Sequence, residues 1–285
     1  MIKIVKSRIL ELVSLGNITD LLIEKALEKY QLRMKNIKKL GDKKIKPHCL
    51  FDWIVLAENE DIKALSFIKF INQQSKELFN QVDPKFHPKI RSKLIEIVCT
   101  VETDVELPHN PSHLNFLAEF FGLNHILRVT EGRFKLEEIE KVLPNGKQSD
   151  FAFYDNETQE LLYVDFVSIH NIDVGRLSGN ADLIEFFEYR FNQKLASKIK
   201  NLNTNFNRIE IEEGKQVNFA ILPIVWSEIS ELLPFQEAFE TIDDKYANSF
   251  SCCTLLPEKL EDKSIHYSFC KVSHVLKRRS EISHL

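Results

Sequence analysis

Two aspartates have a spacing that could hold a metal ion. Asp150 and Asp165 fall in two segments rich in aromatic and β-branched residues, 149–154 and 161–169, which flank the polar run 155–160. This pattern predicts a β-hairpin. If the hairpin is symmetric about the centre of the polar run, paired residue numbers add up to 315, as 150 and 165 do. The two aspartates then lie directly opposite each other on one face, with Cβ atoms about 4.5–5.5 Å apart.

Two carboxylates held this close repel each other unless another group offsets their charge. Either one of them is protonated or a cation lies between them. Their oxygens suit Mg²⁺, or Mn²⁺, which commonly binds one or two carboxylates together with waters and phosphate oxygens. The alternative is that the acids merely flank a turn and never meet, because a slip of one residue would send one of them to the opposite face.

The segments around the hairpin predict the elements that would position the acids. A helix over 113–121, ended by Gly122, precedes it and carries Glu119. A second helix, about 182–202, follows with apolar residues spaced by four. Beside that apolar row runs a basic row, formed by Arg190, Lys194 and Lys198. The pattern then predicts a buried strand over 217–222, a helix over 227–241 and a last strand over 265–272.

This order of residues resembles the PD-(D/E)XK nuclease superfamily. In that family a helix bearing a glutamate precedes an aspartate in one strand and an acid in the next, followed by a helix and a strand. The matching segments here are 117–122, 149–151 and 164–167, within about 112–225. The resemblance implies a mixed sheet flanked by helices and Mg²⁺-dependent hydrolysis of phosphodiesters. It also implies that Asp150 and Asp165 bind the metal directly, with Glu119 as a weaker, water-mediated ligand.

One position departs from the family pattern. The family has a lysine two residues after the second acid, where this chain has Val167. Without a cation there, both activation of the attacking water and stabilisation of the developing charge would suffer. Lys194 is the first candidate for a relocated lysine and Lys198 the next, with Lys147 as a further one. The alternative is that the basic row is simply the solvated face of its helix.

Basic residues are concentrated near the start of the chain. Residues 1–46 hold 12 Lys and Arg against 5 Asp and Glu, a net charge of +7, so the other 239 residues carry −11. Such asymmetry can mark a surface that faces nucleic acid, or only a solvated helix. The lysines could contact phosphates without reading sequence. The candidate phosphate contacts are Lys38, Lys39, Lys43 and Lys44, together with Arg190 and Lys198.

Composition and punctuation favour an α/β (α+β) protein of two domains. A helical domain over 1–105 precedes an α/β domain over 106–285 with a restriction-endonuclease-like core. The 8 glycines are few for a glycine-cradle nucleotide fold, and the 5 cysteines do not form a secreted disulfide framework. No apolar run approaches the roughly 20 residues that span a bilayer. We therefore expect a cytoplasmic protein without a membrane partner.

The leading hypothesis is a Mg²⁺-dependent nuclease acting on DNA, with RNA as an alternative substrate. The second is the same fold without catalysis, serving as a nucleic-acid-binding or protein-interaction module, and Val167 is the residue that favours it. The third is an unrelated α+β protein. The oligomeric state is left open, with a homodimer as one option.

Overall fold

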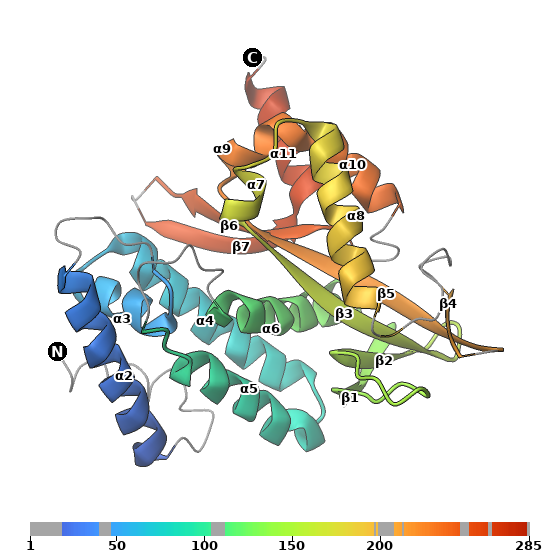
Figure 1. The fold of residues 1–285 in the computed structure, drawn as a ribbon, viewed down its shortest axis with the longest axis horizontal. Coiled ribbons are helices and arrows are strands. Elements are labelled where there is room, and N and C mark those ends of the chain that lie inside the picture. The colour runs from blue at the N-terminus through green and yellow to red at the C-terminus, as the bar shows by residue number, and fades with distance from the viewer. Residues whose placement is uncertain are drawn as a thin grey trace. The chain divides into compact units, whose positions relative to one another are not determined.

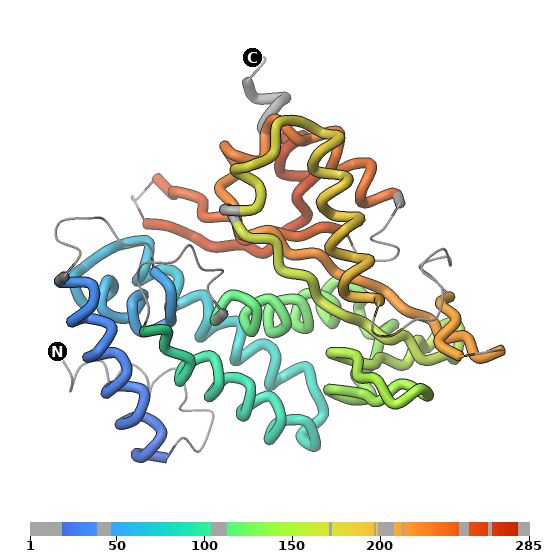
Figure 2. Tube along the Cα trace, in the orientation of Figure 1, coloured from blue at the N-terminus to red at the C-terminus, as the bar shows by residue number. Residues whose placement is uncertain are grey.

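The computed structural model shows a mixed α and β protein (Figures 1 and 2). It divides into two compact units, residues 1–117 with 257–267 and residues 118–256 with 268–285. Within the described part of the chain, no helix is both long enough and apolar enough to span a membrane. The structure describes residues 19–39, 47–103, 112–196, 198, 208–212, 214–245, 251–261 and 264–283.

The first unit is mainly helical, as expected from its pattern. Helices α2, α3 and α4 bury apolar side chains along one face, and so does α5 after a short 3-10 turn. Their bounds are α2 (Asp20–Lys39), α3 (Leu50–Glu58), α4 (Ile62–Gln81), η1 (Pro84–Phe86) and α5 (His87–Cys99).

Two helix boundaries in this unit are not evident from the sequence pattern. A helical pattern runs from Cys49 to about Phe79, but the structure divides it at Glu60, whose φ is 63°. Asp61 is the N-cap of α4, and its side chain accepts the backbone N–H of Ala64. This cap stabilises a new helix start and so favours two helices over one. The lysine-rich segment that begins at Lys35 does not interrupt the first helix, because α2 continues to Lys39.

The second unit holds most of a sheet that has seven strands among the described residues. Its order is β1-β2-β3-β5-β6-β7, and β4 pairs with β5. The first three strands form an antiparallel meander, whereas β5 runs parallel to both β3 and β6. The strands are β1 (Phe134–Ile139), β2 (Phe151–Asp155), β3 (Glu160–His170), β4 (Arg208–Glu212), β5 (Lys215–Trp226), β6 (Cys253–Lys259) and β7 (Ile265–Lys271).

Helix α8 connects the parallel strands β3 and β5, which cannot be joined by a tight turn. Its apolar row is fully buried, as the four-residue spacing predicts. α8 ends at Ala196, earlier than the predicted end at Leu202, a residue that lies outside the described part. The remaining helices are α7 (Asn171–Val174), α8 (Asn180–Ala196), α9 (Ile229–Leu232), η2 (Leu233–Phe235), α10 (Gln236–Lys245) and α11 (Val272–Ser283).

The hairpin of β2 and β3 has the predicted register. Paired residues run from Phe151 with Val164 to Asp155 with Glu160, so every pair adds up to 315. One face of the hairpin packs in the core with α8, and this face carries Tyr163. The rings on the other face pack edge to face at a centroid distance of 5.5 Å between Phe151 and Phe166.

Helix α6 (Ser112–Val129) corrects one prediction, because Gly122 does not end it. The glycine lies within the helix and faces β3. A Cβ at this position would overlap the ring of Phe166, with its Cδ1 only 2.6 Å away. The missing side chain therefore lets the helix approach the strand that carries Asp165.

We predict that Gly122→Ala destabilises the protein by about 1–3 kcal/mol, because the added methyl group must displace a packed ring. Urea unfolding followed by circular dichroism measures the change. Gly179→Ala is the matched control, since nothing lies within 4 Å of a Cβ there. Equal stability of the two variants would contradict the account of Gly122.

Candidate active site

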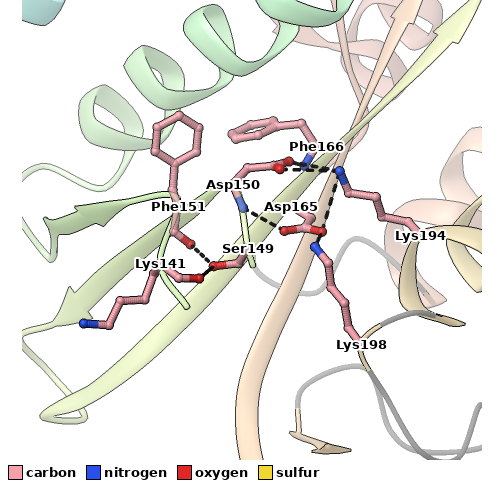
Figure 3. A network of polar contacts seen from close by, with 8 residues as sticks. All are labelled: Lys141, Ser149, Asp150, Phe151, Asp165, Phe166, Lys194 and Lys198. Atoms are coloured by element: carbon pink, nitrogen blue, oxygen red, sulfur yellow. Dashed lines mark hydrogen bonds and ion pairs between the residues drawn. The ribbon is translucent and has the colours of Figure 1, made fainter. Parts of the chain in front are cut away.

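Each of the two carboxylates, those of Asp150 and Asp165, accepts a backbone N–H from the segment that carries the other (Figure 3). The backbone N–H of Asp150 donates to Oδ1 of Asp165 at 2.9 Å. The backbone N–H of Phe166 donates to Oδ2 of Asp150 at 2.8 Å. The predicted side-by-side placement is confirmed, and the alternative in which the acids never meet is wrong.

The two carboxylates differ in their access to solvent. The side chain of Asp165 has no exposed surface, whereas that of Asp150 is 20% exposed. The carboxylate of Asp165 is therefore enclosed by protein atoms. Asp150 is the acid that a large substrate could reach directly.

Two lysines supply the positive charge that this acidic pair needs. Lys194, on α8, places Nζ 3.2 Å from Oδ2 of Asp150 and 3.6 Å from Oδ2 of Asp165. Lys198, in the turn after α8, forms an ion pair with Oδ2 of Asp165. Figure 3 shows both ammonium groups directed at the carboxylates, while Lys141 points away. The cluster thus holds two negative and two positive groups.

Lys198 is largely buried, with 8% of its surface exposed. Burial lowers the pKa of its ammonium to about 8, and the negative charge of Asp150 acts against that shift. The ring of Phe219 lies 5.5 Å from Nζ and adds a cation–π contact.

The basic row is more than a solvated face, because all three residues contact other polar groups, although the side chain of Lys194 stays 31% exposed. Arg190 donates from Nη2 to the carbonyl oxygen of Ser168 on β3 at 3.2 Å, and the other two members reach the aspartates. Val167, at the position of the family lysine, is 5% exposed and packs in the core with α8. Helix α8 and the turn after it therefore bring ammonium groups to the acids, whereas β3 presents an apolar side chain at the family position.

Two of the oxygen donors that a hard divalent cation takes lie next to each other in this cluster. Two adjacent carboxylates offer the oxygens that Mg²⁺ prefers, and Mg²⁺ commonly takes its other ligands from water and phosphate. Glu119 is half-buried on α6. Among the described residues, no group of three or more His, Cys, Asp or Glu is close enough to share a metal ion. Glu119 therefore does not form a three-ligand group with the two aspartates, and the role of Glu119 as a metal ligand stays a prediction.

The N-terminal lysines belong to the other unit. Lys38 is exposed on α2, and Lys39 is the last residue of that helix. Lys43 and Lys44 lie outside the described residues. Their predicted contact with phosphates therefore stays a prediction.

Asn145 is a residue of the site that the sequence analysis missed. Its side-chain Nδ2 donates to the backbone carbonyl oxygen of Lys198 at 2.9 Å. The available signal was the dipeptide Asn145-Gly146, which is typical of a turn, directly before the first strand of the hairpin.

We predict strong energetic coupling between Asp165 and Lys198, because both are buried and in contact. A double-mutant cycle with Asp165→Asn and Lys198→Met, measured by urea unfolding, should give a coupling energy of about 1–3 kcal/mol. The exposed pair Glu212 and Lys215 is the control, for which about 0.5 kcal/mol or less is expected. Additive effects at Asp165 and Lys198 would contradict the pairing.

Three comparisons with known proteins found no relative of this chain. No protein-family model matches it, no curated protein matches it, and no solved structure matches it. Any functional inference must therefore come from the residues and their geometry.

Proposed function

We propose that the protein is a Mg²⁺-dependent nuclease that cleaves DNA with a site of the PD-(D/E)XK type. The observation that carries the proposal is the contact of one ammonium group, that of Lys194, with both Asp150 and Asp165. An acid directly before β2, an acid in the middle of β3 and a lysine beside both are the groups that such a reaction needs.

The order of elements supports the same proposal. Helix α6, strand β2 after Asp150, strand β3 with Asp165, helix α8 and strand β5 occur in the same order as in the nuclease superfamily, with β1, α7 and β4 between them. The departure at Val167 is offset in this proposal by Lys194, which approaches the acids from α8. A helix that crosses over the sheet can deliver a side chain to the point that the strand residue would otherwise reach.

Each residue of the cluster has a separate task in the proposed reaction. Asp150 and Asp165 would hold Mg²⁺, which supplies Lewis-acid polarisation of the phosphate when it is bound. Lys194 would donate hydrogen bonds to the attacking water or to the charge that develops on the phosphate oxygens. Lys198 stays on the buried oxygen of Asp165 and fixes its orientation.

A second candidate function is a nuclease-like module that binds nucleic acid or protein without cleaving. Two observations favour it. Oδ1 of Asp165 and Oδ2 of both acids already accept hydrogen bonds or ion pairs from the chain itself. No third acidic ligand joins them among the residues that the structure describes.

Cleavage should depend on both acids and on Lys194. We expect Asp150→Asn, Asp165→Asn and Lys194→Met each to lower Mg²⁺-dependent cleavage of plasmid DNA by about 10²-fold or more. Asparagine is preferred to alanine at 165, because its side-chain oxygen can still accept the N–H of Asp150. Glu212→Gln, on the exposed β4–β5 turn, should leave cleavage unchanged. Full activity in both aspartate variants would refute the proposal.

Metal binding distinguishes the two candidate functions. Because an ion that binds only the folded state stabilises it, Mg²⁺ or Mn²⁺ should raise the melting temperature of the wild type. The rise should be lost in Asp150→Asn and kept in Lys194→Met, since the lysine does not bind the metal. An equal melting temperature with and without the ions in the wild type would favour the module that does not cleave.

A further inference from the structure

The loop between β1 and β2 has a closed, well-bonded backbone. Residues 140–149 connect β1 to Asp150, and the N–H of Leu143 donates to the carbonyl of Lys147 at 2.6 Å. The N–H of Gly146 donates back to the carbonyl of Leu143 at 2.9 Å. Gly146 adopts a φ of 80°, which glycine tolerates without strain. The turn therefore presents its side chains in a fixed arrangement.

Asn145 lies inside this turn and uses both ends of its amide. Its Oδ1 accepts the backbone N–H of Lys147 at 3.2 Å, which locks the side chain against its own turn. Its Nδ2 then donates to the carbonyl of Lys198 at 2.9 Å. One amide therefore joins the loop before Asp150 to the turn after α8.

The backbone at Lys198 needs such a partner. α8 ends at Ala196, so Lys198 lies two residues beyond the helix. Its carbonyl oxygen therefore takes no part in the hydrogen bonds of α8. The N–H of Lys198 donates to the carbonyl of Leu195 at 2.7 Å, so the turn stays close to the helix end. Asn145 satisfies the carbonyl of Lys198 from the neighbouring loop.

We propose that Asn145 is a positioning residue of the site, which holds the backbone of Lys198 so that its ammonium stays on Asp165. The inference deepens the proposed function and rests on it for its consequence in the reaction. The bonds close a ring, since Lys198 binds Asp165, Asp165 accepts the N–H of Asp150, and Asp150 follows the loop that carries Asn145. Asn145 acts through Lys198.

The variant Asn145→Asp isolates the donor. Aspartate keeps the shape of the side chain and the oxygen that accepts the N–H of Lys147, but it replaces Nδ2 by a second acceptor. Trace acetylation with acetic anhydride at one fixed pH, read by mass spectrometry, should show Lys198 reacting about fivefold faster or more, as expected from one lost hydrogen bond. Asn145→Ala should act in the same direction without adding charge. The exposed Lys215 serves as the internal reference.

Asn156→Asp is the matched control. Asn156 also donates Nδ2 to a backbone carbonyl, that of Gly132, at 2.9 Å, in the turn between β2 and β3. It should leave the acetylation rate of Lys198 at the wild-type value. An unchanged rate at Lys198 in both Asn145 variants would overturn the inference, and so would an equal rise in Asn156→Asp.

Cleavage assays separate this inference from the proposed function. In a wild type that cleaves DNA, we expect Asn145→Asp to lower kcat about tenfold with little change in KM, because the variant disturbs only the orientation of Asp165, which Lys198 fixes. An unchanged kcat alongside a reactive Lys198 would overturn the inference while the nuclease proposal stands. A wild type that does not cleave with Mg²⁺ refutes the proposed function, and acetylation then decides the role of Asn145 in holding Lys198.

Discussion

The charge balance between two aspartates and two lysines is the constraint on which the site depends. Asp165 is fully buried, and a buried carboxylate without partners would be very costly. It therefore needs the N–H of Asp150 on one oxygen and the lysines on the other. These partners come from the residue before β2, from α8 and from the turn after α8. The cluster therefore connects these regions to β3, which carries Asp165.

The same constraint explains how the surrounding elements are used. The parallel pairing of β3 with β5 requires a crossover helix, and α8 buries its apolar row on the sheet face that carries Asp165. The adjacent basic row then falls next to the acids, where its charges are needed. On the other face, Gly122 lets α6 pack closely against Phe166. The strand that carries Asp165 is therefore held from both faces.

The position of the aspartates could be predicted from the sequence, because the register of a hairpin is a local property. The short turn between two patterned strands leaves one symmetric pairing, and the structure adopts it. The direction of the basic row could not be predicted. Helical periodicity places Arg190 and Lys194 beside the apolar stripe, but a residue at the edge of that stripe can turn to solvent or to the sheet.

Other misses have specific physical causes. β1 was not predicted because three of its six residues are Lys or Glu, which are uncommon in strands. Gly122 was taken as a helix end because glycine marks both helix ends and sites of close packing. Asn145 carries its bond to a residue 53 positions away, and no local pattern predicts such a contact. Long-range polar contacts of this kind become visible only in the folded chain.

The central claim is that the paired carboxylates can share a divalent ion. Anomalous diffraction from crystals soaked in Mn²⁺ tests it most directly. The account predicts one strong peak about 2.1 Å from an oxygen of Asp150 and from an oxygen of Asp165. A map without a peak there, in which both carboxylates keep only their contacts with Lys194, Lys198 and the backbone, would contradict it.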